Sequence, residues 1–182
     1  MGARAIYIRP IEAVDDDVVG WLRQDINRFL NLPVEVMEVM TASPDCFEEK
    51  RKQYNSTKIL GELLREIPPD ALKVLGLIDS DISIPILTFV FGEAQLGGQA
   101  AIVSLTRLRQ EFYGMEPNRQ IFLDRLRKES FHELGHTFGL YHCTEDACVM
   151  KLSSTIFDVD RKGSTFCRDC YLAMFSKMQE GG

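Results

Sequence analysis

Residues 132–142 read HELGHTFGLYH. The spacing of the three histidines in this stretch indicates the local fold, a helix that ends in a turn. On an α-helix, positions i and i+4 lie one turn apart on the same face, with Cβ atoms about 5–6 Å apart. His132 and His136 are therefore able to direct two imidazole rings at one metal ion. Glu133 lies about 100° further round the helix, which is too displaced for a third ligand but within reach of a water molecule on that ion.

The third ligand is predicted to be His142. Gly139 directly follows the predicted helix, and glycine enters the left-handed conformation without steric cost. The chain is then able to turn and bring His142 to the same ion. Three neutral histidines leave zinc with its full charge and an open fourth position, as in a catalytic rather than a structural site. The chain has only 3 histidines, and all of them lie in this stretch.

These residues predict hydrolysis by an activated water. Zinc lowers the pKa of a bound water from about 15.7 to about 7. We expect Glu133 to take a proton from that water as it attacks a peptide carbonyl and to pass it to the leaving amine, while zinc stabilises the oxyanion. The alternative is a pair of core histidines and an exposed glutamate on an amphipathic helix. The placement of Gly139 and His142 argues against that alternative.

Four cysteines follow the histidine stretch as two close pairs. Cys143 and Cys148 are separated by four residues, and Cys167 and Cys170 by two. Spacings of about two to four residues suit tetrahedral thiolate coordination of a second, structural zinc with no open position. The alternatives are two disulfides, which an intracellular chain disfavours, and a zinc ribbon that binds nucleic acid or protein. Cys46 stands apart and is predicted to be an ordinary thiol.

Three stretches have apolar residues at helical spacing. They are residues 18–30, 57–67 and 119–138. Asp15, Asp16 and Asp17 precede the first helix, and N-capping with a favourable helix-dipole interaction explains them better than a metal-binding cluster. Asn118 is the expected N-cap of the last helix. The apolar stripe of that helix is predicted to be Phe122, Leu126, Leu134 and Phe138.

Apolar and β-branched runs between turn signals predict five strands. They lie at residues 5–8, 34–40, 74–78, 85–91 and 100–105, with a loop at 92–98. The alternation of strands and helices predicts the α/β class, with helices packed against a sheet. No repeat or low-complexity linker divides the chain, so we expect a single domain over residues 1–182. In that domain, residues 1–139 supply the sheet and the histidine helix, and residues 140–182 carry the third histidine and the four cysteines.

Composition and charge narrow the class of protein. The 182 residues are 45% hydrophobic and 26% charged, an ordinary balance for one globular domain. The net charge of -6 argues against a nucleic-acid partner, which a basic surplus would favour. No apolar run approaches the roughly 20 residues that span a bilayer, and residues 1–8 lack a secretory pattern. We therefore expect a soluble, cytoplasmic protein without a membrane partner.

Residues 132–142 resemble the extended metzincin signature. Their continuation through Cys143, Cys148 and Met150 to FCRDC at residues 166–170 resembles the archaemetzincins, a family of zinc metalloproteases. The resemblance implies a metzincin-like zincin core, in which a mixed twisted sheet and an active-site helix are joined to a C-terminal zinc-bound subdomain. It also implies two zinc ions per chain, one catalytic and one structural.

Two further assignments follow from this resemblance. Met150 is implied to be the methionine of a turn beneath the catalytic metal, although the residues alone leave Met174 and Met178 as alternatives. In metzincins, an edge strand over the cleft binds extended peptide by adding to the sheet. By order along the chain, the substrate-binding segment expected there is Ile86, Leu87, Thr88, Phe89, Val90 and Phe91. The alternative for that segment is an ordinary buried strand.

The sequence leaves the identity of the substrate open. An aminopeptidase would need an acidic group to hold the substrate amine, and no single acidic residue stands out. Two rival functions are a zinc-bearing interaction protein with little turnover and a zinc amidohydrolase that acts on a non-peptide amide. Glu133 favours an enzyme, because a scaffold has no chemical need for it. A peptide or protein substrate is therefore expected.

Overall fold

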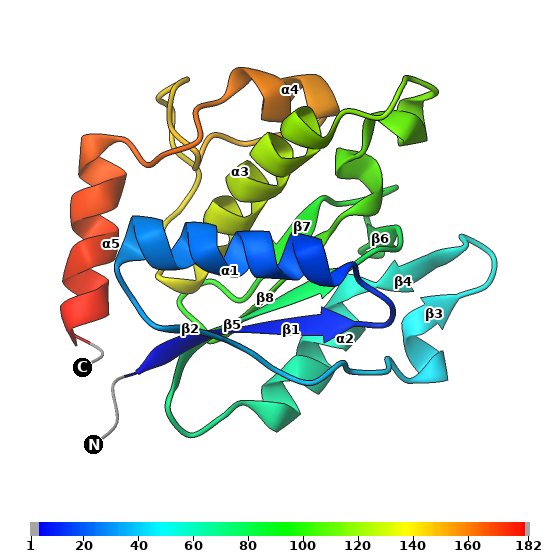
Figure 1. The fold of residues 1–182 in the computed structure, drawn as a ribbon, viewed down its shortest axis with the longest axis horizontal. Coiled ribbons are helices and arrows are strands. Elements are labelled where there is room, and N and C mark those ends of the chain that lie inside the picture. The colour runs from blue at the N-terminus through cyan, green and yellow to red at the C-terminus, as the bar shows by residue number, and fades with distance from the viewer. Residues whose placement is uncertain (1–3, 181–182) are drawn as a thin grey trace.

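The main sheet contains the longest strands of the protein. The computed structural model describes residues 4–180, and its largest sheet has five strands in the order β2-β1-β5-β8-β7 (Figure 1). The first four strands run parallel, and β7 runs antiparallel to β8. This mixed sheet confirms the predicted α/β class. The strands are β1 Ala5–Ile11, β2 Val34–Val36, β5 Ala71–Ile78, β7 Gly92–Ala94 and β8 Ala100–Ser104.

Helices cover both faces of this sheet. The helices α1 (Asp16–Leu30) and α3 (Arg119–Thr137) pack on one face, and α2 (Ser56–Leu63) packs on the other (Figure 1). Because side chains alternate along a strand, Leu75 of β5 belongs to the first core and Val74 to the second. A parallel strand covered by helices on both faces is buried on both, which is why β5 reads as a nearly continuous apolar run.

The helix boundaries agree with capping residues in the sequence. The Asp15 side chain accepts a hydrogen bond from the Asp17 backbone N–H at 2.8 Å, at the start of α1. At the start of α3, the Asn118 side chain accepts one from the Ile121 N–H at 3.1 Å. Just beyond α3, Gly139 has a left-handed φ of 86°, as expected for a glycine that follows a helix. The predicted caps and the predicted extent of this helix are confirmed.

The sequence does not predict the second sheet, which has three strands in the order β3-β4-β6. The strands β3 and β4 form an antiparallel hairpin, and β6 runs parallel to β4. Strands of two or three residues are too short to show a recognisable alternation. Their bounds are β3 Phe47–Glu48, β4 Gln53–Asn55 and β6 Ile82–Ser83.

The predicted strand at residues 85–91 is wrong. These residues form a loop that contains a turn, in which the Leu87 N–H donates to the Ile84 carbonyl at 3.2 Å. The Leu87 and Thr88 carbonyl groups are bound by the side chain of Arg51 instead of by a neighbouring strand. Strand contacts begin only at the end of the segment, where Val90 makes an isolated bridge with Ile82. The edge strand is β7, which lies in the segment predicted to be a loop. A short apolar run has no period that separates a strand from other buried structure, and this explains the error.

The predicted strand at residues 34–40 is shorter than expected. Only β2 is a strand, and Met40 makes an isolated bridge with Ile11. The chain after α3 contains two more helices, α4 Ile156–Arg161 and α5 Arg168–Glu180. Within the described residues, short 3₁₀ helices connect the other elements at Pro44–Cys46, Leu64–Glu66, Thr106–Leu108 and Gln110–Tyr113.

No helix within residues 4–180 combines the length and hydrophobicity needed to cross a membrane. Residues 1–3 and 181–182 lie outside the described part of the chain. The predicted lack of a secretory pattern in residues 1–8 and the two ends of the predicted domain fall partly on these residues.

Candidate active site

The second half of α3 is buried. Every residue from Lys128 to Gly135 is buried, because this part of the helix packs against the main sheet, α1 and α4. Polar side chains in such a place are costly unless they are paired or bind a ligand. Among them, Glu129, His132 and Glu133 line a cleft of about 520 Å³.

The three histidine rings surround one point. The Nε2 atoms of His132 and His136 are 3.1 Å apart, and the ring centroids of His136 and His142 are 4.9 Å apart. One nitrogen from each ring lies within 4.8 Å of the other two. Tetrahedral ligands at about 2.0–2.1 Å from zinc would place their nitrogen atoms about 3.4 Å apart. The donor set therefore fits zinc.

Backbone carbonyl groups orient two of the rings. His132 Nδ1 lies 2.9 Å from the Val149 carbonyl oxygen, and His136 Nδ1 lies 2.7 Å from that of Leu140. An Nδ1–H that donates to a carbonyl leaves the Nε2 lone pair free for a metal. Burial lowers the pKa of His132 well below its ordinary value, and also lowers the pKa values of His136 and His142. The neutral ring, which is the form that binds zinc, is therefore favoured.

The left-handed turn at Gly139 brings His142 back to the end of α3. The Gly139 N–H donates to the His136 carbonyl at 2.9 Å, and the Leu140 N–H donates to the Gly135 carbonyl at 3.0 Å. These bonds satisfy carbonyl groups at the helix end. The chain thus reverses direction within three residues, as the histidine spacing requires.

Glu133 is buried beside the histidines and packs against β7. A Cβ atom at Gly92 would lie 2.6 Å from Glu133 Cγ and 2.7 Å from its Oε1, so a side chain at Gly92 would displace the carboxyl group. Burial raises the pKa of Glu133 well above its ordinary value, and the Glu129 carboxylate raises it further. The Lys162 ammonium acts in the opposite direction.

Besides α3, β7 and Leu96, two further segments of the chain line the cleft. From the segment that leads into β7 come Leu87, Thr88, Phe89, Val90 and Phe91. The remaining residue of the predicted substrate-binding segment, Ile86, is not among the cleft-lining residues and is 86% exposed. From the chain after α3 come Tyr141, His142, Leu152, Ser153 and Ser154.

Met150 packs directly on the histidine-bearing turn of α3. It is fully buried, and a Cβ atom at Gly135 would lie 2.4 Å from the Met150 sulfur. Gly135 immediately precedes His136, so the thioether contacts the helix backbone between two of the histidines. The alternatives lie elsewhere, since Met174 and Met178 both belong to α5. The assignment of Met150 to the methionine turn stays a prediction from the metzincin resemblance.

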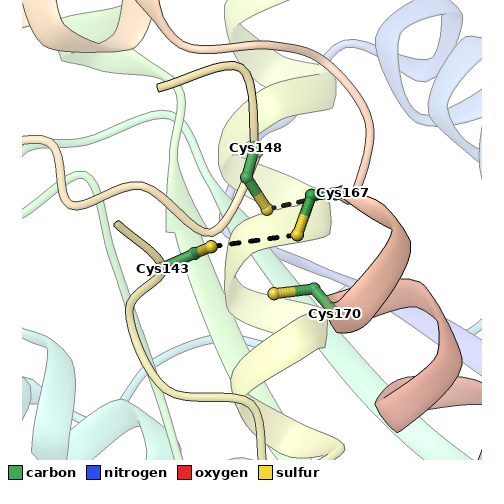
Figure 2. Close-up of side chains that lie close together, drawn as sticks. All are labelled: Cys143, Cys148, Cys167 and Cys170. Carbon is green, nitrogen blue, oxygen red and sulfur yellow. Dashed lines mark hydrogen bonds between the residues drawn. The ribbon is translucent and has the colours of Figure 1, made fainter. Parts of the chain in front are cut away.

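The four clustered cysteines point their sulfur atoms toward one another (Figure 2). The four sulfur atoms lie within 4.8 Å of one another, and those of Cys143 and Cys167 are 3.8 Å apart. A disulfide bond is about 2.05 Å long, whereas thiolates at about 2.3 Å from a tetrahedral zinc are about 3.8 Å apart. The Cys167 N–H also donates to the Cys148 sulfur at 3.3 Å. The geometry fits a closed zinc site, and Cys46 is a buried free thiol.

A buried ion pair next to His132 is a part of the site that sequence reasoning missed. Lys162 Nζ lies 2.8 Å from Glu129 Oε1 and 3.4 Å from His132 Nδ1. Lys162 and Glu129 are each only 3% exposed. Glu129 lies one turn before Glu133 on α3, and this helical spacing is a signal that could have found it. Lys162 lies 30 residues after His132, and only the fold brings it here.

Comparison with known proteins identifies the family. Residues 16–175 match the model of Peptidase family M54. The chain is 37% identical over 177 residues to the archaemetzincin of Methanocaldococcus jannaschii, covering 97% of this chain and 94% of that protein. It is 40% identical over 166 residues to the archaemetzincin of Archaeoglobus fulgidus, covering 91% and 95%.

Solved structures extend this likeness to the whole fold. The crystal structure of archaemetzincin from Methanopyrus kandleri matches with a TM-score of 0.83 at 32% identity, over 97% of this chain and 96% of that one. The crystal structure of the Archaeoglobus fulgidus archaemetzincin, complexed with malonate, matches with a TM-score of 0.81 at 38% identity, over 93% and 99%. The match therefore covers far more than the histidine and cysteine stretch. The chain belongs to peptidase family M54, the archaemetzincins, and is a zinc metallopeptidase.

Proposed function

We propose that His132, His136 and His142 hold the catalytic zinc of this peptidase and that Glu133 is its general base. The observation that carries the proposal is the convergence of one nitrogen from each ring in a cleft that Glu133 also lines. Membership of a peptidase family makes peptides or proteins the substrate class. The rival functions, an interaction protein with little turnover and a non-peptide amidohydrolase, are not favoured.

The chemistry divides between the metal and the carboxylate. A zinc ion held by the three histidines would supply Lewis-acid chemistry, which would lower the pKa of water to about 7 and polarise a carbonyl oxygen. The Glu133 carboxylate accepts the proton of the attacking water and delivers it to the nitrogen of the leaving amine. The backbone of Gly92 packs against this carboxyl group and so fixes the position from which the proton is moved.

We propose that the substrate pairs with the free edge of β7. The Ser104 N–H donates to the Phe91 carbonyl at 2.9 Å. Phe91 and Ser104 are therefore a hydrogen-bonded pair at the start of the antiparallel ladder between β7 and β8. Antiparallel pairs alternate between hydrogen-bonded and non-hydrogen-bonded, so Gly92 and Ala94 direct their N–H and C=O groups away from β8. Both residues line the cleft, and an extended peptide adds to such an edge as a further strand. In this proposal β7 takes the pairing role that was predicted for residues 86–91.

We also infer a second, structural zinc, which gives two zinc ions per chain. Its proposed ligands are Cys143, Cys148, Cys167 and Cys170, whose convergence supports the proposal. These cysteines join the segment after α3 to the beginning of α5. Because Cys143 directly follows His142, a closed thiolate site would also brace the third histidine.

The whole chain is proposed to act as one catalytic domain. In this arrangement residues 1–139 supply the sheet and the histidine helix, and residues 140–182 supply the third histidine and the cysteines. A shared core supports the proposal, because Val149, Val159 and Phe166 belong to the same buried cluster as α1 and α3.

Replacing His136 with alanine tests the ligand assignment. We expect the zinc content to fall from two ions per chain to one and peptide cleavage to stop, because the thiolate site is separate from the histidine site. Zinc per chain is measured by native mass spectrometry after loosely bound metal has been removed. Cys46→Ser is the control and keeps both ions. Two retained zinc ions in His136→Ala would contradict the assignment.

A further inference from the structure

The loop that leads into β7 forms part of the cleft wall. We call residues 84–91 the rim loop. Its residues Leu87, Thr88 and Phe89 line the cleft. Within the loop, the Leu87 N–H donates to the Ile84 carbonyl at 3.2 Å. The Phe91 carbonyl, at the end of the loop, accepts from the Ser104 N–H of β8 at 2.9 Å. The carbonyl groups earlier in the loop need other donors.

One guanidinium group binds three carbonyl oxygens of the rim loop. Arg51 Nη1 donates to the Ile84 carbonyl at 3.2 Å, and Nη2 donates to the Thr88 carbonyl at 2.9 Å and to the Leu87 carbonyl. A guanidinium presents five N–H donors in a fixed planar fork, which a lysine ammonium does not reproduce. Arg51 lies in the turn between β3 and β4, so the hairpin is fastened to the rim loop.

Gln53 orients Arg51 and binds the same loop. The Gln53 amide oxygen accepts a hydrogen bond from Arg51 Nε at 2.9 Å. Its amide nitrogen donates to the Thr88 carbonyl at 2.9 Å and to Asp81 Oδ2 at 2.8 Å. Because Gln53 is only 5% exposed, water competes little for these bonds, and they are stronger than they would be at the surface.

Arg107 adds a second contact to the rim loop. It forms a bidentate ion pair with Asp81, with both N–O distances at 2.7 Å. Its guanidinium carbon lies 4.0 Å from the centroid of the Phe89 ring, which is a cation–π contact. The Phe89 ring in turn packs edge-on against Phe91, with centroids 5.3 Å apart. Asp81 binds both Gln53 and Arg107. The residues that bind the loop's carbonyl groups and the residue that contacts Phe89 therefore belong to one hydrogen-bonded network.

We propose that Arg51 is a positioning residue for peptide binding, which holds the rim loop in the conformation that presents Leu87 and Phe89 to the substrate. Arg51 is not among the described residues that line the cleft, so it acts through the loop. A wall that is formed beforehand avoids the cost of ordering side chains on binding. The three-stranded sheet then has a role, since it delivers Arg51 and Gln53 to the loop. This inference rests on the proposed binding of peptide in the cleft.

The variant Arg51→Met tests the proposal through binding. Acetohydroxamate engages the zinc alone, whereas N-acetyl-dileucyl hydroxamate also places two apolar side chains in the cleft. In calorimetric titrations of zinc-loaded protein, we expect Arg51→Met to weaken the peptidyl ligand about tenfold and to leave acetohydroxamate within about twofold of the wild type. Arg51→Lys keeps the charge but not the fork, so it is expected to weaken the peptidyl ligand nearly as much.

The neighbouring residue provides a matched control. Lys52→Met removes a cation from the same hairpin turn, whose side chain is 74% exposed and pairs with Glu49, and it is expected to bind both ligands like the wild type. Equal weakening of both ligands by Arg51→Met would assign Arg51 to the fold or the zinc site and overturn the proposal. Wild-type affinity for the peptidyl ligand in Arg51→Met would also overturn it. A wild type that binds the peptidyl ligand no tighter than acetohydroxamate would instead refute peptide binding in the cleft, and the positioning role with it.

Discussion

Two glycines allow other parts of the fold to approach α3 closely. A Cβ atom at Gly92 of β7 would lie 2.6 Å from the Glu133 side chain, and one at Gly135 of α3 would lie 2.4 Å from the Met150 sulfur. Neither glycine has a positive φ. Space, and not backbone conformation, therefore excludes a side chain at both positions. One contact fixes Glu133, the proposed general base, and the other fixes the turn of α3 that carries His132 and His136.

The contact at Gly92 gives a prediction at the residue scale. We expect Gly92→Ala to lower kcat about a hundredfold, because displacing a catalytic group by about 1 Å is enough to cause such a loss. Zinc content is expected to stay normal, since the three atoms nearest to a Cβ there belong to Glu133 and Ile102 and not to a histidine. Gly20→Ala is the control, because nothing lies within 4 Å of a Cβ there. An unchanged kcat in Gly92→Ala would show that this packing does not position Glu133.

The convergence of the three histidines could be predicted because its signal is local. His132 and His136 are one helical turn apart, and Gly139 marks the turn that brings in His142. The residues that support them could not be predicted in this way. Gly92 contacts Glu133, and Lys162 pairs with Glu129, from elements outside α3. No regular spacing in the sequence predicts either contact.

At the scale of elements, α4 and the residue after it are held on α3 by two ion pairs, one partly exposed and one buried. Arg125 of α3 forms a bidentate ion pair with Asp160 of α4, at 2.7 and 2.8 Å. Lys162, just after α4, pairs with Glu129 of α3 at 2.8 Å. The Lys162–Glu129 pair is buried, and such a pair contributes little net stability compared with apolar residues of the same shape, but the loss of one partner is costly. The pairs therefore fix how the C-terminal part sits on the histidine helix.

The variant Lys162→Met tests this docking. We expect it to lower the free energy of unfolding by about 3–5 kcal/mol, because Glu129 would stay buried without its partner. The double variant Glu129→Gln/Lys162→Met leaves no unpaired charge and should recover most of the loss. Urea denaturation in excess zinc measures the free energy of unfolding of both variants. If the single and double variants unfolded at the same midpoint as the wild type, the ion pair would have no part in holding α4.

Helices could be predicted from the sequence more accurately than the elements at the cleft. The caps Asp15 and Asn118 lie within three residues of the groups that they bind. The rim loop depends on Arg51, which lies more than 30 residues away in the chain, so its apolar run is mistaken for a strand. Because of that error, the sequence predicts that peptide pairs with residues 86–91, whereas the proposed pairing edge is the neighbouring strand β7.

At the scale of the whole molecule, the cleft lies between segments that precede and follow α3 in the chain. The rim loop and β7 come before the helix, and the residues from Tyr141 to Ser154 come after it. The cleft-lining residues include Glu93, Glu129 and Glu133 but no lysine or arginine. From this lining and the net charge of -6, we expect acidic peptides to be poor substrates.

The role of Glu133 is tested most directly by digesting a mixed peptide library with zinc-loaded wild type and with Glu133→Gln, side by side. Products are identified by mass spectrometry, and zinc content is measured on the same samples. We expect the wild type to cleave peptides and Glu133→Gln to be at least about a hundredfold slower at equal zinc content, because the amide cannot accept the proton. Cleavage at the same sites and the same rate by both proteins would contradict the assignment of Glu133 as the general base.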